Sequence, residues 1–123
     1  MKLSVVLATF NEEKNLAACL DSVKGLADEI VVVDGKSSDQ TVEIAKKYGA
    51  HIIVTSNKPV FHINKQIAID NAHEDWILQL DADERVTPEL SKEIKSEIRN
   101  PKSEINGYWI PRKNWFLGRF LIS

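Results

Sequence analysis

Residues 76–83 read Trp76-Ile77-Leu78-Gln79-Leu80-Asp81-Ala82-Asp83, an apolar run followed by two carboxylates one residue apart. The run predicts a buried strand over residues 76–80, because a short, nearly continuous apolar stretch is typical of a strand covered on both faces. Two carboxylates at the carboxyl tip of a strand are suitable ligands for a hard cation and for the phosphates that it bridges. Acidic residues also cap turns at strand ends, so the motif needs support from the rest of the chain.

The chain around this stretch alternates strand and helix patterns. Strands are predicted over residues 3–9, 29–33, 51–54 and 76–80, and helices between Asn11 and Gly25, between Asp39 and Gly49, over about 63–72, and from Thr87 to Asn100. This alternation predicts an α/β fold, with a mostly parallel sheet flanked by helices. Right-handed crossovers favour the strand order 3-2-1-4.

Capping and periodicity add local expectations. The expected helix caps are Asn11, Ser38 or Asp39, and Thr87, and the expected left-handed stops are Gly25 and Gly49. The third helix is expected to bury Ile63, Ile67 and Ala68. From Gly107 onward, aromatic and basic residues predict two short strands joined by a basic turn.

Length and composition limit the classes of function. The chain has 123 residues, 43% hydrophobic and 28% charged, with a net charge of -2, which fits a single domain over residues 1–123. The slight negative charge argues against a nucleic-acid partner. No apolar run approaches the roughly 20 residues of a membrane span, and polar residues 11–14 arrive too early for a signal peptide. We therefore expect a cytoplasmic protein.

Cysteine and histidine offer no obvious chemistry in this sequence. Cys19 is the one cysteine, and it shares a helical face with Leu16 and Leu20, so we expect a buried thiol without reactivity. The histidines are His51, His62 and His73, and they lack the close spacing of a metal site.

Polar side chains follow three of the predicted strands. Thr9, Asn11 and Glu12 lie at the end of the first strand, Asp34 at the end of the second, and the Asp81–Asp83 pair at the end of the fourth. In the order 3-2-1-4 these ends are neighbours, and ligands of open parallel sheets bind beyond the carboxyl ends of the strands. The spacing therefore predicts that Glu12, Asp34 and Asp83 meet at one cleft.

The usual phosphate-binding loops are absent from the sequence. Gly35-Lys36-Ser37 resembles the end of a P-loop, but Ile30 occupies the position that requires a glycine. The first strand–helix turn contains no G-x-G-x-x-G. A nucleotide bound here needs another holder for its phosphates, and a divalent cation on Asp83 would serve.

Four linked segments carry a family resemblance: residues 5–12 (VVLATFNE), 30–41 (IVVVDGKSSDQT), 64–66 (NKQ) and 80–83 (LDAD). In this order and spacing they resemble family 2 of the glycosyltransferases, whose nucleotide-sugar-binding domain has the GT-A fold. Within that family they are most similar to bacterial sugar transferases of lipopolysaccharide core and envelope polysaccharide synthesis. The resemblance implies that residues 1–123 form the nucleotide-sugar-binding portion, with the acceptor-binding remainder absent.

The resemblance also implies roles for individual residues. The nucleotide-binding set it implies is Thr9, Asn11, Glu12, Asp34, Lys65, Asp81, Ala82 and Asp83. Asp34 would accept a hydrogen bond from the nucleobase, Glu12 one from a sugar hydroxyl, and Lys65 would approach the base or a phosphate. Asp83, with Asp81, would bind Mn²⁺ or Mg²⁺ across the diphosphate. Turn or helix capping and a solvated helix charge are the structural alternatives for these residues.

The reaction implied is metal-assisted transfer of a sugar, with a UDP-linked donor favoured, to a saccharide or glycolipid acceptor, with inversion. The catalytic base would lie beyond Ser123. Arg85 stands where some relatives have a neutral ligand, and a guanidinium does not bind a cation. Contact of residues 112–120 with the inner face of the membrane remains an alternative to packing of these residues in the core.

Other function classes fit parts of the pattern. A haloacid-dehalogenase-type phosphatase would use Asp81 as its nucleophile, but that motif opens its fold, whereas here it follows three predicted strands. A receiver-like module fits the length, but Thr9 and Asn11 stand where it needs acidic residues. A domain that binds a nucleotide or nucleotide sugar without turnover is the alternative from a different class.

Overall fold

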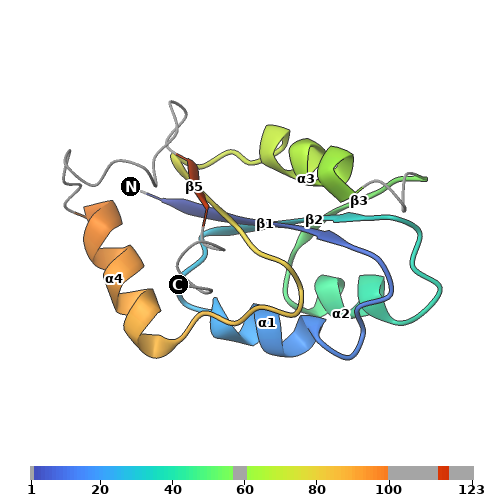
Figure 1. Ribbon diagram of the computed structural model, residues 1–123, viewed down its shortest axis with the longest axis horizontal. Coiled ribbons are helices and arrows are strands. Elements are labelled where there is room, and N and C mark those ends of the chain that lie inside the picture. Colours follow the sequence, from blue (N-terminus) through green and yellow to red (C-terminus); the bar gives the residue numbers. More distant parts are fainter. Residues whose placement is uncertain (1, 57–60, 100–113, 117–123) are drawn as a thin grey trace.

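The computed structural model describes residues 2–56, 61–99 and 114–116 of the chain (Figure 1). In this part of the chain, parallel strands form one five-stranded sheet in the order β3-β2-β1-β4-β5. The strands are β1 Leu3–Thr9, β2 Glu29–Asp34, β3 His51–Val54, β4 Trp76–Gln79 and β5 Asn114–Phe116, and the helices are α1 Leu16–Ser22, α2 Thr41–Lys47, α3 Phe61–Asp70 and α4 Pro88–Arg99. The α/β class and the order 3-2-1-4 are confirmed, and β5 extends the sheet beyond β4.

Helices cover both faces of the sheet, with α3 on one face and α1 and α2 on the other (Figure 1). Because the side chains of a strand alternate between faces, β1 supplies Val5 and Leu7 to the core beneath α1 and Val6 to the core beneath α3. All three side chains are fully buried. Each such burial contributes about 1.5–3 kcal/mol, so β1 anchors the strands whose ends carry the polar residues.

The start of the first helix differs from the prediction. The structure begins α1 at Leu16, and Asn11 is not its cap. Asn11 has a φ of 52°, which is left-handed, and its Oδ1 accepts the backbone N–H of Ser38 at 2.8 Å. The side chain that was expected to cap a helix therefore joins the exit loop of β1 to the exit loop of β2.

The other caps and stops follow the sequence more closely. The N-cap of α2 is Gln40 and not Ser38 or Asp39, although Asp39 Oδ1 accepts the N–H of Thr41 at 3.0 Å. Thr87 Oγ1 accepts the N–H of Leu90 at 3.1 Å in α4, as expected of a cap. Gly25 and Gly49 both have positive φ, at 86° and 75°. These turns confirm that the two glycines provide left-handed conformations that other residues adopt at a cost.

The buried face of α3 is only partly as predicted. Ala68 is fully buried, but Ile63 is 42% exposed, so its assignment to the core side was wrong. Asn64 is fully buried in its place, and its Oδ1 accepts the hydroxyl of Thr55 at 3.2 Å. A hydrogen bond to the neighbouring loop makes this polar burial tolerable, which hydrophobic periodicity does not register.

Most of the segment after residue 107 lies outside the described residues. Its backbone is described at β5, which pairs in parallel with β4 at Ile77–Gln79. The remainder of the predicted strand pair, the basic turn and the suggested membrane contact fall on residues that the structure does not describe. Among the described residues, every helix is too short or too polar to cross a lipid bilayer.

Candidate functional site

A pocket of about 250 Å³ lies where the carboxyl ends of β1 and β4 meet α3. We call it the carboxyl-end pocket, and it is lined by Ala8, Glu12, Lys65, Asp81, Ala82 and Asp83. It lies at the junction between β1 and β4, where the strand order reverses direction and where open α/β sheets bind ligands. The structure therefore brings together Glu12, Lys65 and the Asp81–Asp83 turn, which are far apart in the sequence.

Hydrogen bonds fix the backbone of the turn after β4. The N–H of Asp81 donates to Glu84 Oε1 at 2.8 Å, and the N–H of Glu84 donates back to the carbonyl of Asp81 at 2.9 Å. The guanidinium of Arg85 donates to the carbonyls of Ala82 and Glu84 at 3.0 and 2.9 Å. Arg85 thus holds the main chain of the turn.

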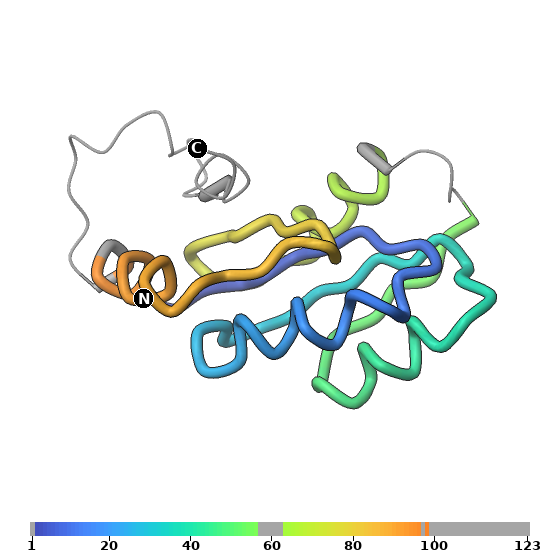
Figure 2. The backbone as a smooth tube through the Cα atoms, turned by 60° about the horizontal axis from the view of Figure 1, so that its bottom comes forward, coloured from blue at the N-terminus to red at the C-terminus, as the bar shows by residue number. Residues whose placement is uncertain are grey.

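Helix α1 supports the same turn from below, and Figure 2 shows the turn lying beside the start of this helix. Cys19 Sγ lies 3.7 Å from the carbonyl of Asp81, and Ser22 Oγ accepts the N–H of Val86 at 3.0 Å. Burial raises the pKa of the Cys19 thiol to about 12. Cys19 is therefore a buried packing residue, as predicted.

The two aspartates of the turn have different surroundings. Asp81 Oδ1 lies 3.1 Å from Lys65 Nζ, with the Lys65 side chain 33% exposed and that of Asp81 52% exposed. Asp83 is also exposed. Among the described residues, no hydrogen bond or ion pair is formed by its carboxylate. The pocket therefore presents one carboxylate held by a lysine and one open to a ligand.

Asp34 and Thr9 are buried beside this pocket and do not line it. Thr9 Oγ1 donates to Asp34 Oδ1 at 2.7 Å. Ser37 donates its hydroxyl to Oδ1 at 2.6 Å and its N–H to Oδ2 at 2.7 Å. The carboxylate thus accepts three hydrogen bonds at the junction of β1 and β2. Of the three carboxylates expected at one cleft, Asp34 therefore does not line the pocket with Glu12 and Asp83.

Asn11 also lies outside the pocket lining. The loops after β1 and β2 bond to each other through Asn11 N–H to Ser37 Oγ at 2.8 Å and Glu12 N–H to Thr41 Oγ1 at 2.9 Å. The predicted set did not include Ser37, which contacts both Asn11 and Asp34. Its signal in the sequence is a small polar residue three positions after the strand-terminal aspartate.

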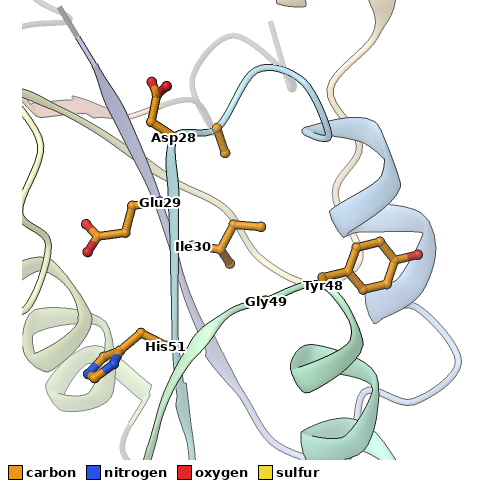
Figure 3. A pocket seen from close by; sticks show the side chains of 7 residues that line it. Asp28, Glu29, Ile30, Tyr48, Gly49 and His51 are labelled. Carbon is orange, nitrogen blue, oxygen red and sulfur yellow. The ribbon is translucent and has the colours of Figure 1, made fainter.

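A second pocket, of about 340 Å³, lies at the amino ends of β2 and β3, and we call it the amino-end pocket. Figure 3 shows Ile30 and Tyr48 on one side of β2, and Glu29 and His51 on the other. Tyr48 donates to Asp21 at 2.7 Å, which raises the pKa of the Tyr48 phenol. Since open parallel sheets bind ligands at the carboxyl ends of their strands, the smaller carboxyl-end pocket is the better candidate.

Comparison with known proteins agrees with this geometry. The chain matches the family model described as "Glycosyl transferase family 2" over residues 4–121. An uncharacterised glycosyltransferase of Rickettsia typhi is 43% identical over 96 residues, covering 76% of this chain and 32% of that protein. The lipopolysaccharide core biosynthesis glycosyltransferase LpsC of Rhizobium meliloti is 28% identical over 127 residues, covering 96% of this chain and 44% of that protein. The chain thus spans less than half the length of these relatives.

Solved structures show the same fold. TarS 1–349 of S. aureus in complex with UDP has a TM-score of 0.66 and 29% identity, covering 90% of this chain and 38% of that chain. Glucosyl-3-phosphoglycerate synthase from Mycobacterium tuberculosis, in complex with Mn²⁺, UDP and glucosyl-3-phosphoglycerate, has a TM-score of 0.51 and 26% identity, covering 66% of this chain and 33% of that chain. The GT-A type of α/β fold, expected from the sequence, is confirmed.

Proposed function

The chain belongs to glycosyl transferase family 2, and from this premise we propose that it binds a nucleotide-diphosphate sugar, UDP-linked, for transfer to an acceptor. The observation that carries the proposal is the convergence of Glu12, Lys65, Asp81 and Asp83 on one pocket at the sheet's switch point. Relatives that bind UDP share 29% and 26% identity with this chain. The family match favours sugar transfer over the phosphatase alternative.

The acidic turn fits a divalent cation that is bound together with the substrate. In the part of the chain that the structure describes, no group of three or more metal-binding side chains is assembled. Mg²⁺ and Mn²⁺ in nucleotide sites use one or two carboxylates, and substrate phosphates and water complete the shell. Asp83 and Asp81 would supply those carboxylates, and Mn²⁺ in a relative agrees with this. When bound, the ion would offset the charge of the departing diphosphate.

The remaining predicted residues would position the nucleoside. Glu12, in the pocket lining, would accept a sugar hydroxyl, and its Oε1 is oriented by the amide of Asn15 at 3.1 Å. Asp34 would bind a nucleobase if a base N–H replaced the Ser37 hydroxyl, which donates to Asp34 Oδ1 at 2.6 Å. Thr9 and Asn11 would form the wall behind the base, and Ala82 leaves room for the phosphates.

The proposal also covers the acceptor and the stereochemical outcome of the transfer. We infer an inverting transfer to a saccharide or glycolipid, in line with LpsC among the relatives. In such a reaction an acceptor hydroxyl attacks the anomeric carbon, and a carboxylate base takes its proton. By resemblance to inverting members of the family, we place that base beyond Ser123.

Calorimetric titration of the full-length protein tests the proposal. UDP and UDP-sugars should bind in the presence of Mn²⁺, and binding should be lost with EDTA. Asp83→Ala should weaken Mn²⁺-dependent UDP binding at least about 100-fold, because loss of a direct ligand should exceed the cost of losing a supporting contact. Asp75→Ala removes an exposed carboxylate from the opposite end of the sheet and should bind UDP normally.

Two results would contradict the proposal. Equal UDP affinity in Asp83→Ala and the unaltered protein would exclude the acidic turn as the phosphate site. Tight UDP-sugar binding without transfer to any saccharide or lipid-linked acceptor would favour the alternative of a binding domain without turnover.

A further inference from the structure

Lys65 and Asp81 form an ion pair in the lining of the carboxyl-end pocket. Their charged atoms, Nζ and Oδ1, are 3.1 Å apart, and both side chains remain partly exposed. Lys65 comes from α3, whereas Asp81 follows β4, so the pair joins two elements on either side of the pocket. An ion pair of this exposure contributes little to stability, about 0–1 kcal/mol, so its position calls for another explanation.

The charges that line the pocket are unbalanced. Three acidic residues, Glu12, Asp81 and Asp83, line the pocket with Lys65, which is the one basic residue of the lining among the described residues. Arg85 is bonded to main-chain carbonyls of the turn, so Lys65 is the cation that pairs with one of the turn's carboxylates. When a divalent cation binds the same turn, it competes for the Asp81 oxygen and repels the ammonium, because two cations cannot share one carboxylate at close range without a Coulomb cost.

We propose that Lys65 is an exchangeable counter-ion: it holds Asp81 in the empty pocket, releases it when the divalent cation binds, and then pairs with the diphosphate. This inference rests on the proposed function, which it deepens by linking metal binding to nucleotide binding. The flexible stem of a lysine allows its charge to move between two nearby anions. The 33% exposure of its side chain leaves space for that movement.

The exchange makes the cation and the nucleotide bind cooperatively. The cation frees Lys65, and the freed ammonium offers a charge-assisted hydrogen bond to the phosphates that it could not offer while paired. By linkage, the nucleotide must then raise the affinity for the cation by the same factor. Lys65 therefore opposes the cation alone and favours the nucleotide that follows.

Lys65→Met in the full-length protein tests the exchange, because methionine keeps the length of the side chain and removes its charge. Mn²⁺ alone, followed by the electron paramagnetic resonance of free Mn²⁺, should bind about two- to fivefold more tightly to the variant, the range that loss of an exposed ion pair allows. UDP measured at saturating Mn²⁺ should bind about tenfold more weakly, since a charged hydrogen bond is lost. Lys46→Met, an exposed lysine of α2, is the matched control and should change neither value.

A second substitution separates the ion pair from a general effect of charge. In an Asp81→Asn background, Lys65→Met should alter the Mn²⁺ affinity by less than it does in the unaltered protein, because the competing pair is already broken. If Lys65→Met raised the Mn²⁺ affinity as much in the Asp81→Asn background as in the unaltered protein, the proposed counter-ion role of Lys65 would be wrong. Thermal unfolding of each variant confirms that it is folded before binding is compared.

The outcomes distinguish this inference from the proposed function. Unchanged Mn²⁺ affinity in Lys65→Met with weaker UDP binding would leave the nucleotide site intact and overturn the counter-ion role. Mn²⁺ binding that is detectable in neither protein would overturn it as well. Failure of UDP to bind the unaltered protein with Mn²⁺ would contradict the proposed function, and the Mn²⁺ measurement without nucleotide would still report on Lys65.

Discussion

Carboxylates at the two ends of the sheet differ in their hydrogen-bond partners. At the amino end, Glu29 accepts hydrogen bonds from Ser4 Oγ at 2.5 Å, from the N–H of His73 at 2.8 Å and from its ring nitrogen at 2.6 Å. At the carboxyl end, Asp81 pairs with a partly exposed lysine. Asp83 forms no hydrogen bond within the ranges that the structure describes. At the amino end, donors of the protein itself bind the carboxylate, whereas the carboxyl end leaves carboxylate oxygens available to a ligand.

The hydrogen-bond partners of a carboxylate therefore indicate its role better than its position at the end of a strand does. Asp34 illustrates the point, because it ends β2 at the carboxyl end of the sheet yet is fully buried. Its three donors come from Thr9 and Ser37. In its hydrogen bonding Asp34 therefore resembles Glu29 more than Asp83, and it joins strands as Glu29 does.

Asp34→Ala should give the largest loss of stability. The substitution leaves the Thr9 hydroxyl and the Ser37 N–H without their buried acceptor, which we expect to cost about 3 kcal/mol of the free energy of unfolding. Urea unfolding at neutral pH measures this loss. Asp83→Ala, which removes an exposed carboxylate, should change stability by less than about 0.5 kcal/mol. Equal losses in the two variants would remove the distinction between paired and open carboxylates.

Glu29→Ala should have an intermediate effect and should leave ligand binding intact. Its side chain is 19% exposed, and its loss deprives the buried Ser4 hydroxyl of an acceptor, at an expected cost of about 2 kcal/mol. Glu29→Gln keeps an acceptor for Ser4 and should cost less than half as much. Mn²⁺-dependent UDP affinity should match that of the unaltered protein in both variants. Weakened UDP binding in a folded Glu29 variant would show that the two ends are coupled.

The sequence predicted the sheet well because its strands are buried on both faces. In β1 and β2, nearly continuous runs of valine, leucine and isoleucine are typical of strands buried on both faces. Short connections between consecutive elements then favoured one order of the strands in the sheet. Helix starts were less predictable. Asn11 has the chemistry of a cap, but the N–H of Ser38 competes for the same oxygen, and that contact depends on loops distant in the sequence. The prediction that Ile63 is buried was wrong because the neighbouring Asn64 is buried instead, where it accepts a hydrogen bond from Thr55.

The site was predicted from the strand ends of Glu12, Asp34 and Asp83. The structure brings Glu12 and the Asp81–Asp83 turn together with Lys65 of α3 in one pocket, whereas Asp34 does not line it. Sequence patterns locate residues at strand ends but do not show which side chains already have partners. The burial of Asp34 depends on Thr9 and Ser37, and the orientation of Arg85 depends on two carbonyls of its own turn. These contacts follow from side-chain geometry, which spacing alone does not determine.

The smallest predicted effect is a pH dependence at the amino end. The hydrogen bond to Glu29 raises the pKa of His73 above 6.5, with a smaller contribution from the charge of Glu74. Burial raises the pKa of Glu29, but bonds from Ser4 and His73 outweigh it and hold that pKa below 4.5. The His73 contribution to stability is therefore fully present below pH 6.5 and is lost as pH rises through the raised pKa.

His73→Gln should lower the urea midpoint at about pH 5.5 and have less effect at about pH 8.5. His51→Gln, at the same end of the sheet, is the matched control, and an effect of His73→Gln that is equal at both pH values would show that the charged pair does not form.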